Sequence, residues 1–151
     1  MRGHAGLLLG TLFLATSAHP IRAQPDDGQV VKTPTEVQFK APLAGGLQAA
    51  VLYGDPSKPG VYVVRIKVPP GYKSSPHFHT DEYRGVVVIS GTLYFAISDV
   101  RDDSKLRAYP AGTFFTEPPK MAHYAEAKDT EVVFDVTGIG PTSTVPVPVK
   151  Q

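Results

Sequence analysis

Two histidines separated by a single residue, His77 and His79, are the side chains of this sequence most suited to binding a metal ion. On a β-strand, residues i and i+2 point to the same face, so both imidazoles could ligate one metal ion. A third nitrogen ligand would come from His123, because the remaining histidines, His4 and His19, lie in the N-terminal leader. Three histidines that leave coordination positions open are typical of a catalytic metal site rather than a closed structural one.

The composition narrows the class of protein. A length of 151 residues suits one domain, and a hydrophobic content of 42% is enough for a core. The absence of Cys excludes a disulfide framework, a thiolate nucleophile, an iron–sulfur cluster and a Cys-type zinc site. The formal net charge of +1 argues against a general nucleic-acid-binding protein.

The N-terminus has the pattern of a secretory signal peptide. A basic start is followed by the apolar or small stretch Ala5–Ala18, and Ala23 precedes a polar segment. We therefore expect removal of residues 1–23 and export to the periplasm or the extracellular space. Removal takes Arg2 and Arg22 away, so the basic residues fall from 15 to 13 against 14 acidic ones. The mature chain then has no basic excess for polyanions and no segment that anchors it in a membrane.

The rest of the chain has the pattern of short strands. The 15 Pro and 14 Gly disfavour long helices. In the segment Val61–Val68, Arg65 and Lys67 alternate with apolar residues, as in a half-buried strand. We also expect a hairpin around Ser90-Gly91. The expected strands are Leu47–Tyr53, Val61–Val68, Val86–Ile89, Thr92–Ile97, Leu106–Tyr109, Thr113–Thr116 and Val132–Thr137.

These segments suggest one all-β domain with extended ends. Many short strands separated by turn signals indicate a sandwich or a barrel, which we place at residues 47–140. Residues 24–46 would form an N-terminal arm or edge segment. Residues 141–151 would form an extended tail, because alternating Pro forbids a helix or a central strand.

Two motifs in this region resemble those of the cupin superfamily. The first cupin motif is matched by Gly71-x5-His77-x-His79 and, later, Gly91. The second is matched by Gly112-x5-Pro118, followed by His123. The resemblance covers roughly Leu47 to Val136 and includes every histidine of the mature chain. It implies a single-domain jelly-roll barrel, the cupin-type double-stranded β-helix, with the three imidazoles in its interior near one mouth.

The motifs depart from the family pattern at three positions. Arg84 stands where the family has Glu, and the nearest preceding carboxylate is Glu82, which would share a face with Arg84 if the strand has begun. Three arrangements stay open: a metal held by three His alone, by three His plus Glu82, or a metal-free barrel in which Arg84 pairs with Glu82 or a substrate anion. Lys120 replaces a Gly, which could alter the turn before His123, and Ala127 replaces an Asn.

The resemblance also suggests the contents of the site. One divalent transition metal, Mn, Fe, Ni, Zn or Cu, would be held by the histidines, with Glu82 as a further ligand or as the catalytic base. Glu117 would face solvent. Substrate-binding candidates are Arg84, Tyr83, Tyr94 and Phe114, and the wider set of lining candidates adds Val86, Val88, Phe95 and Phe115.

The cupin resemblance allows three functions. The first is a mononuclear metalloenzyme, dioxygenase-like or of the isomerase or decarboxylase type, that acts on a small organic molecule. The second is a non-catalytic cupin that binds a metal or a small molecule, and the third is a metal-free stress or structural module. The resemblance also suggests a homodimer, while the near-neutral charge of the chain gives no reason to expect a nucleic-acid partner.

Overall fold

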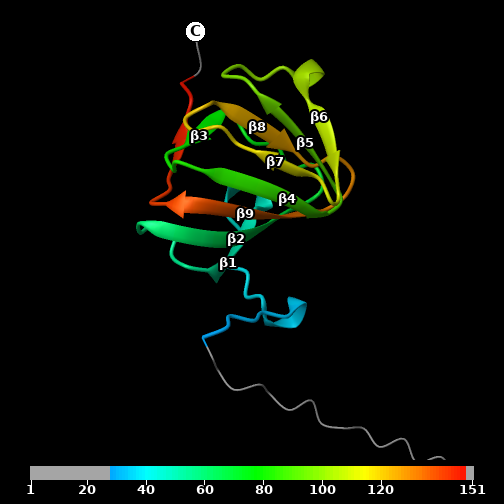
Figure 1. Cartoon of the computed structure of the whole chain (residues 1–151). Helices are drawn as coiled ribbons and strands as arrows, with labels where there is room; N and C mark the ends of the chain where they lie inside the picture. Colours follow the sequence, from blue (N-terminus) through cyan, green and yellow to red (C-terminus); the bar gives the residue numbers. More distant parts are fainter. Residues whose placement is uncertain (1–27, 149–151) are drawn as a thin grey trace, which may run out of the picture.

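The computed structural model describes residues 28–148, and the expected signal peptide lies outside the described residues. The chain forms two five-stranded sheets that face each other and enclose the core (Figure 1). Every pairing between strands is antiparallel, which confirms the all-β prediction. No helix within the described residues is long and apolar enough to cross a membrane.

The two sheets alternate along the chain. The first has the order β1-β2-β9-β4-β7, with β1 (Gln48–Tyr53), β2 (Gly60–Val68), β9 (Val132–Gly140), β4 (Arg84–Ser90) and β7 (Phe114–Thr116). The second has the order β10-β3-β8-β5-β6, with β10 (Thr144–Pro146), β3 (His77–His79), β8 (His123–Glu126), β5 (Thr92–Ile97) and β6 (Arg107–Pro110). Three short 3-10 turns complete the structure: η1 (Pro34–Glu36), η2 (Ala44–Gly46) and η3 (Asp103–Lys105).

The expected hairpin around Ser90-Gly91 is wrong. Strands β4 and β5 follow each other in sequence but belong to different sheets, so the chain crosses from one sheet to the other at Gly91. Gly91 has a φ of 74°, and a Cβ there would lie 2.5 Å from the carbonyl oxygen of Glu131. Only glycine fits this crossing, which lets β4 and β5 face each other across the core instead of pairing edge to edge.

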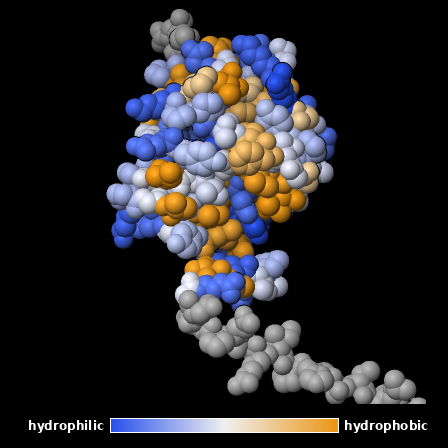
Figure 2. Space-filling model, in the orientation of Figure 1, coloured by the Kyte–Doolittle hydropathy of each residue, from blue (hydrophilic) through white to orange (hydrophobic). Residues whose placement is uncertain are grey.

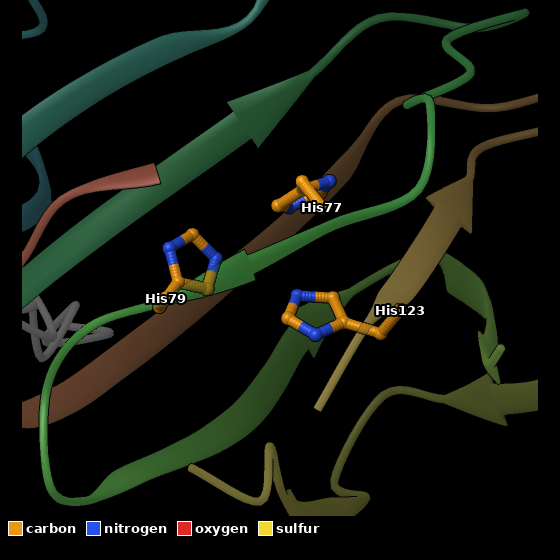
Figure 3. A group of neighbouring side chains, drawn as sticks. All are labelled: His77, His79 and His123. Atoms are coloured by element: carbon orange, nitrogen blue, oxygen red, sulfur yellow. The ribbon is translucent and has the colours of Figure 1, made fainter. Parts of the chain in front are cut away.

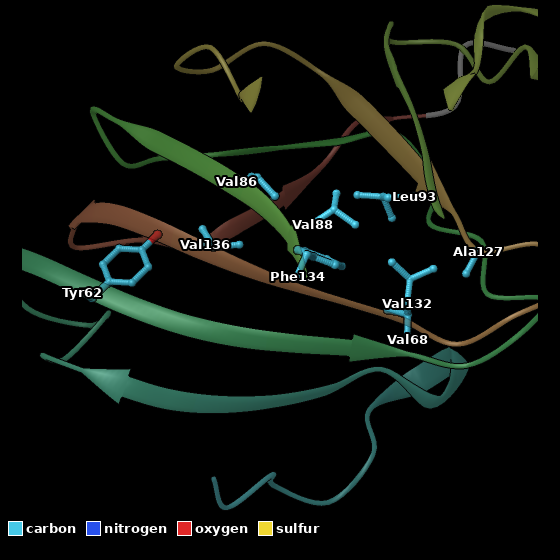
Figure 4. Packing of buried hydrophobic residues seen from close by; sticks show 9 residues of the cluster. All are labelled: Tyr62, Val68, Val86, Val88, Leu93, Ala127, Val132, Phe134 and Val136. Carbon is cyan, nitrogen blue, oxygen red and sulfur yellow. The ribbon is translucent and has the colours of Figure 1, made fainter. Parts of the chain in front are cut away.

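The core fills the space between the sheets. Alternate residues of β2, β4, β5 and β9 point inward, and their branched side chains pack with Leu93 and Phe134 (Figure 4). Tyr62 lies at one end of the core and is almost completely buried. Its hydroxyl is a polar group among otherwise apolar side chains. The alternation in Val61–Val68 therefore positions inward residues that both fill the core and reach the site.

The Pro-rich C-terminal segment supplies an edge strand. Strand β10 pairs with β3, bringing Thr144 opposite His79 and Pro146 opposite His77. Pro is acceptable in an edge strand because its missing N–H does not break a ladder on both sides. This strand covers the backbone that carries two of the three histidines.

The outer face of the first sheet carries apolar side chains. Val87 of β4 is paired with Phe114 of β7 on this face, and Phe114 is 60% exposed. Figure 2 shows apolar residues between hydrophilic ones on the surface turned toward the viewer. Apolar faces of this kind are suited to packing against another protein surface, and the homodimer stays a prediction.

Candidate metal centre

The three histidines converge inside the barrel. His77 and His79 point to the same face of β3, and His77 lies opposite His123 of β8 in the strand register (Figure 3). The centroids of the imidazole rings are 4.6 Å apart for His77 and His123, 5.1 Å for His77 and His79, and 5.2 Å for His79 and His123. One nitrogen from each ring lies within 4.8 Å of the others, so the three could hold one ion.

Hydrogen bonds from Nδ1 to backbone carbonyl groups orient the imidazole rings of His77 and His123. The Nδ1 of His77 is 2.7 Å from the carbonyl oxygen of Ser75, and the Nδ1 of His123 is 3.0 Å from that of Met121. A carbonyl can only accept, so both Nδ1 atoms carry a proton, and in the neutral ring the lone pair is then on Nε2. This is the tautomer in which imidazole binds a metal through Nε2.

The third ring lies beside the edge strand. The Nδ1 of His79 is 3.3 Å from the hydroxyl oxygen of Thr144 in β10. Burial and the Arg84 guanidinium lower the pKa of His79 to about 3, and burial likewise lowers the pKa of His123. Both side chains are therefore neutral near pH 7, which is the state a metal ion requires.

A buried carboxylate, Glu117, completes the arrangement. It follows β7, is 9% exposed, and places its Oε2 3.8 Å from Nε2 of His79 and 3.7 Å from Nε2 of His123. Burial opposes ionisation of Glu117, but the positive charge of Arg84 lowers its pKa below the usual range. An ionised oxygen then lies near the imidazole nitrogens of His79 and His123, at distances too long for hydrogen bonds. Neutral imidazole nitrogens and a carboxylate oxygen are donors that a divalent transition metal accepts, so this set of residues fits a bound metal ion.

Arg84 joins this carboxylate to a second buried network. Its Nε donates to Oε2 of Glu117 at 2.5 Å, and its Nη1 donates to the Tyr62 hydroxyl at 2.8 Å. The Tyr62 hydroxyl donates in turn to Oδ2 of Asp81 at 2.6 Å, and the hydroxyl of Thr142 donates to Oδ1 of Asp81 at 2.9 Å. Burial raises the pKa of Tyr62 to about 12, so its proton stays in place near pH 7. The network fixes the guanidinium beside the histidines.

A cavity of about 850 Å³ opens onto the histidines. Its polar end is bordered by the three imidazoles with Arg84 and Glu117. Its remaining wall is largely apolar and includes Leu47, Val64, Ile66, Leu93, Phe95, Phe134 and Val136. A volume of this size is in the range of small-molecule sites.

The structure places the sequence-predicted site residues in two groups. His77, His79, His123 and Arg84 border the cavity together. Glu82 is exposed, because β4 begins only at Arg84 and Glu82 lies in the preceding turn, off the inward face. The carboxylate beside the histidines is Glu117 instead, and it is Glu117 rather than Glu82 that pairs with Arg84.

The three aromatic residues expected to bind substrate, Tyr83, Tyr94 and Phe114, are not among the residues that border the cavity within residues 28–148. Tyr83 is 41% exposed, and its hydroxyl and the Phe114 ring both lie close to Gly85 on the outer face of the sheet. Tyr94 lies under the ammonium group of Lys128, 4.0 Å from the ring centroid to Nζ. Among the other lining candidates, Phe95 does border the cavity, while Val86 and Val88 are core residues.

Sequence reasoning missed Glu117 and assigned it to solvent, which is wrong. Strand alternation carried the signal: Phe115 faces the interior, so a residue two positions on shares that side. Of the departures from the motif, Lys120 has a φ of 57°, so it adopts the left-handed conformation that glycine favours. Ala127 is completely buried in the core cluster.

Comparisons with known proteins agree on the architecture. No protein-family model and no curated protein sequence matches the chain. Among solved structures, the polyketide cyclase RemF from Streptomyces resistomycificus superposes with a TM-score of 0.64 at 16% identity, covering 80% of this chain and 87% of that one. A cupin-2 domain from Rhodospirillum rubrum gives a TM-score of 0.61 at 17% identity, covering 87% of this chain and 84% of that one.

A third similar structure is described as a sugar phosphate isomerase of the cupin superfamily from Silicibacter pomeroyi. It superposes with a TM-score of 0.56 at 18% identity, covering 70% of this chain and 73% of that one. Two of these neighbours are described as enzymes, and their similarity to this chain, at TM-scores of 0.64 and 0.56, is one of fold. The fold implied by the two sequence motifs is thereby confirmed, and the chain has the jelly-roll barrel of the cupin superfamily.

Proposed function

We propose that this protein is a mononuclear metalloenzyme that acts on a small organic molecule. The observation that carries the proposal is the convergence of imidazole nitrogens on a point that Glu117 also faces. The backbone hydrogen bonds of His77 and His123 select the neutral tautomer in which Nδ1 carries the proton and Nε2 is the atom available to a metal. A divalent transition ion is the partner that neutral imidazoles and one carboxylate oxygen prefer.

His77, His79 and His123 would hold the ion, with Glu117 as a fourth ligand or as a base beside it. Mn, Fe, Ni, Zn and Cu all accept such donors, and the absence of thiolate leaves nothing to select a soft ion. When bound, the ion supplies Lewis-acid polarisation of a carbonyl or oxygen activation. Fixing of the rings by Ser75, Met121 and Thr144 keeps the ligands in place.

The Glu117 carboxylate favours reactions that move a proton on the bound molecule. It is ionised and lies beside the proposed metal position, so it can accept a proton from a carbon or oxygen of the substrate. Isomerisation and decarboxylation need such a group, and an oxygenase could use it to deprotonate its substrate. Two structural neighbours, described as a cyclase and an isomerase, give this reading support from the same fold.

Metal analysis of the purified protein tests the proposal. After expression with each of the five ions, the wild-type protein should contain about one equivalent, as one site per protomer requires. The variant His77→Ala/His79→Ala should lose it, while Glu82→Gln, a change at an exposed carboxylate, should not. Absence of stoichiometric metal in the wild type under all five conditions would remove the basis of the proposal.

A substrate screen separates an enzyme from a binding protein. The metal-loaded protein would be offered candidate substrates for ring cleavage, decarboxylation and isomerisation, with oxygen uptake and product formation recorded. Turnover that disappears in the double histidine variant supports the enzyme. Binding without turnover across the screen would favour the alternative of a non-catalytic cupin.

We also propose that the protein is exported, on the pattern of residues 1–23. The N-terminal sequence of the protein recovered from the periplasm or the medium should begin near Gln24. Recovery of the protein with its first residues intact in the cytoplasm would contradict export.

A further inference from the structure

The charges around the cavity leave a specific imbalance. Arg84 is the cation of the buried network, and Asp81 and Glu117 are its two carboxylates, so the cluster carries one net negative charge. A histidine that binds a metal through Nε2 is neutral, so the three imidazoles do not alter this count once an ion is bound. Lys73 also borders the cavity, but it already pairs with Glu126 at 3.3 Å.

A divalent ion on the three histidines reverses the sign of the cluster. With the ion bound, the buried charge becomes +1, and an uncompensated buried charge is costly in a low-dielectric site. One further negative charge would balance it. Arg84 borders the same end of the cavity, so its guanidinium adds a fixed positive charge close to an anion bound there.

The strand register places an apolar wall directly behind this charged end. Tyr62, Gly138 and Arg84 form one row across β2, β9 and β4. The rows two and four residues further along β2 begin at Val64 and Ile66, which pair with Val136 and Phe134. All four of these apolar side chains border the cavity.

The length of this wall sets the shape of the ligand. Successive inward residues of a strand are about 6.6 Å apart, so the apolar wall extends roughly 13 Å beyond the row of Arg84. Leu43 and Leu47 border the cavity as well. A molecule that has only a charged head would leave this wall in contact with water.

We propose that the cavity binds an amphiphilic monoanion, a small molecule with one carboxylate or enolate head at the histidine and Arg84 end and an apolar body along Val64, Ile66, Val136 and Phe134. This inference rests on the proposed metal site, because the metal supplies the positive charge that the head balances. The apolar rows favour a ligand with an apolar body. The net charge of +1 in the metal-bound site favours a ligand with one negative group over a neutral ligand or a dianion.

Calorimetry with a set of matched probes tests the inference on the whole protein. The protein is loaded with Zn²⁺, which has no redox chemistry, and its metal content is measured on the same sample. Octanoate should bind about tenfold or more tightly than octan-1-ol, because a charge-assisted hydrogen bond is worth more than a neutral one. Octanoate should also bind about tenfold or more tightly than acetate, which lacks the apolar body.

Metal removal and one pair of variants complete the design. The metal-free protein should lose octanoate binding, because its cluster is already negative. Ile66→Ala should weaken octanoate roughly three- to tenfold and leave acetate unchanged, because it removes apolar contact only in the inner wall. Ile89→Ala, at a residue that is 44% exposed on the outer face of the same sheet, should change neither.

The outcomes separate this inference from the proposed function. If the protein takes up no Zn²⁺, the metal centre itself fails. If Zn²⁺ binds but octan-1-ol or acetate matches octanoate, the amphiphilic monoanion is overturned while the metal centre stands. Octanoate binding that is equally tight without metal would overturn the charge balance.

Discussion

Arg84 and Glu117 form a buried ion pair beside the three histidines, with Nε of Arg84 2.5 Å from Oε2 of Glu117. Both side chains are more than nine-tenths buried, and they come from β4 and from the residue after its neighbour β7. The cation stands at the position where the motif of the family has Glu, and the carboxylate that it holds faces the same point as the imidazoles. The acidic group of this site therefore stands directly after β7, while the corresponding position of the motif on β4 holds the cation.

Removing the cation of this pair should destabilise the fold strongly. We expect Arg84→Met to lower the free energy of unfolding by about 3–5 kcal/mol, because Glu117 and Asp81 remain buried without their partner. The double variant Arg84→Met/Glu117→Leu should recover part of this loss, since the unpaired carboxylate at the site is then gone. Urea unfolding of the metal-free proteins measures both.

The pair of Arg65 with Asp135 supplies a matched control. It is also an arginine–carboxylate pair between neighbouring strands, at 2.7 Å, but its side chains are 23% and 19% exposed. Solvent screening should limit the loss in Arg65→Met to about 1 kcal/mol or less. Equal losses for Arg84→Met and Arg65→Met would show that burial of the first pair has no energetic consequence.

Glu117 should contribute to metal affinity, and Glu82 should not. Glu117→Gln removes a negative charge next to the Nε2 atoms of His79 and His123, so we expect the affinity for a divalent ion to fall about 10- to 100-fold. Glu82→Gln changes an exposed carboxylate that does not border the cavity. Competition with a chromophoric chelator measures both affinities, and an equal fall in the two variants would refute the role of Glu117.

The sequence was sufficient for the fold class and for the three histidines that converge at the candidate site, because both follow from local patterns. Alternation in Val61–Val68 identifies a strand, and the spacing of His77 and His79 puts them on one face. The motif then selects His123 as their partner. These features depend on neighbouring residues or on a short fixed spacing, which is why they can be read without coordinates.

The predictions that were wrong depend on where each strand begins and on which strands pair with each other. Glu82 would share the inward face with Arg84 only if β4 began two residues earlier than it does. Glu117 reaches the histidines because β7 pairs with β4, a contact between segments far apart in the sequence. The crossing at Gly91 likewise depends on which sheet each strand joins, and a Ser-Gly pair fits a hairpin equally well.

The crossing between sheets should depend on Gly91 more than the turn at Gly112 depends on its glycine. Both residues have positive φ, at 74° and 87°, so alanine is strained at either one. A Cβ at Gly112 would have no atom within 4 Å, whereas one at Gly91 would lie 2.5 Å from the backbone oxygen of Glu131. We expect Gly112→Ala to cost about 1–2 kcal/mol and Gly91→Ala about 2–5 kcal/mol. Urea unfolding compares the two, and equal costs would mean that the chain at Gly91 can shift freely.

The buried histidines should make the metal-free protein less stable in mild acid. The folded-state pKa of His79 is lowered to about 3, and that of His123 is also lowered, whereas unfolded histidine titrates near 6.5. Below pH 6.5 the unfolded chain therefore binds protons that the folded chain does not, so stability falls as the pH falls. The slope is up to about 1.4 kcal/mol per pH unit for each such histidine.

Urea unfolding in the presence of a chelator, at several pH values from 7.5 to 5.0, measures this effect. Stability should be nearly constant between pH 7.5 and 7.0 and should then decline toward pH 5.0. That window lies above 4.5, the ordinary pKa of Glu, so protonation of Glu117, whose pKa is lowered further, does not contribute to it. His79→Gln should show a shallower decline because one of the protonating groups is absent. A wild-type stability that stays constant down to pH 5.0 would mean that the folded protein accepts these protons, and that the imidazoles are open to water rather than enclosed in the barrel.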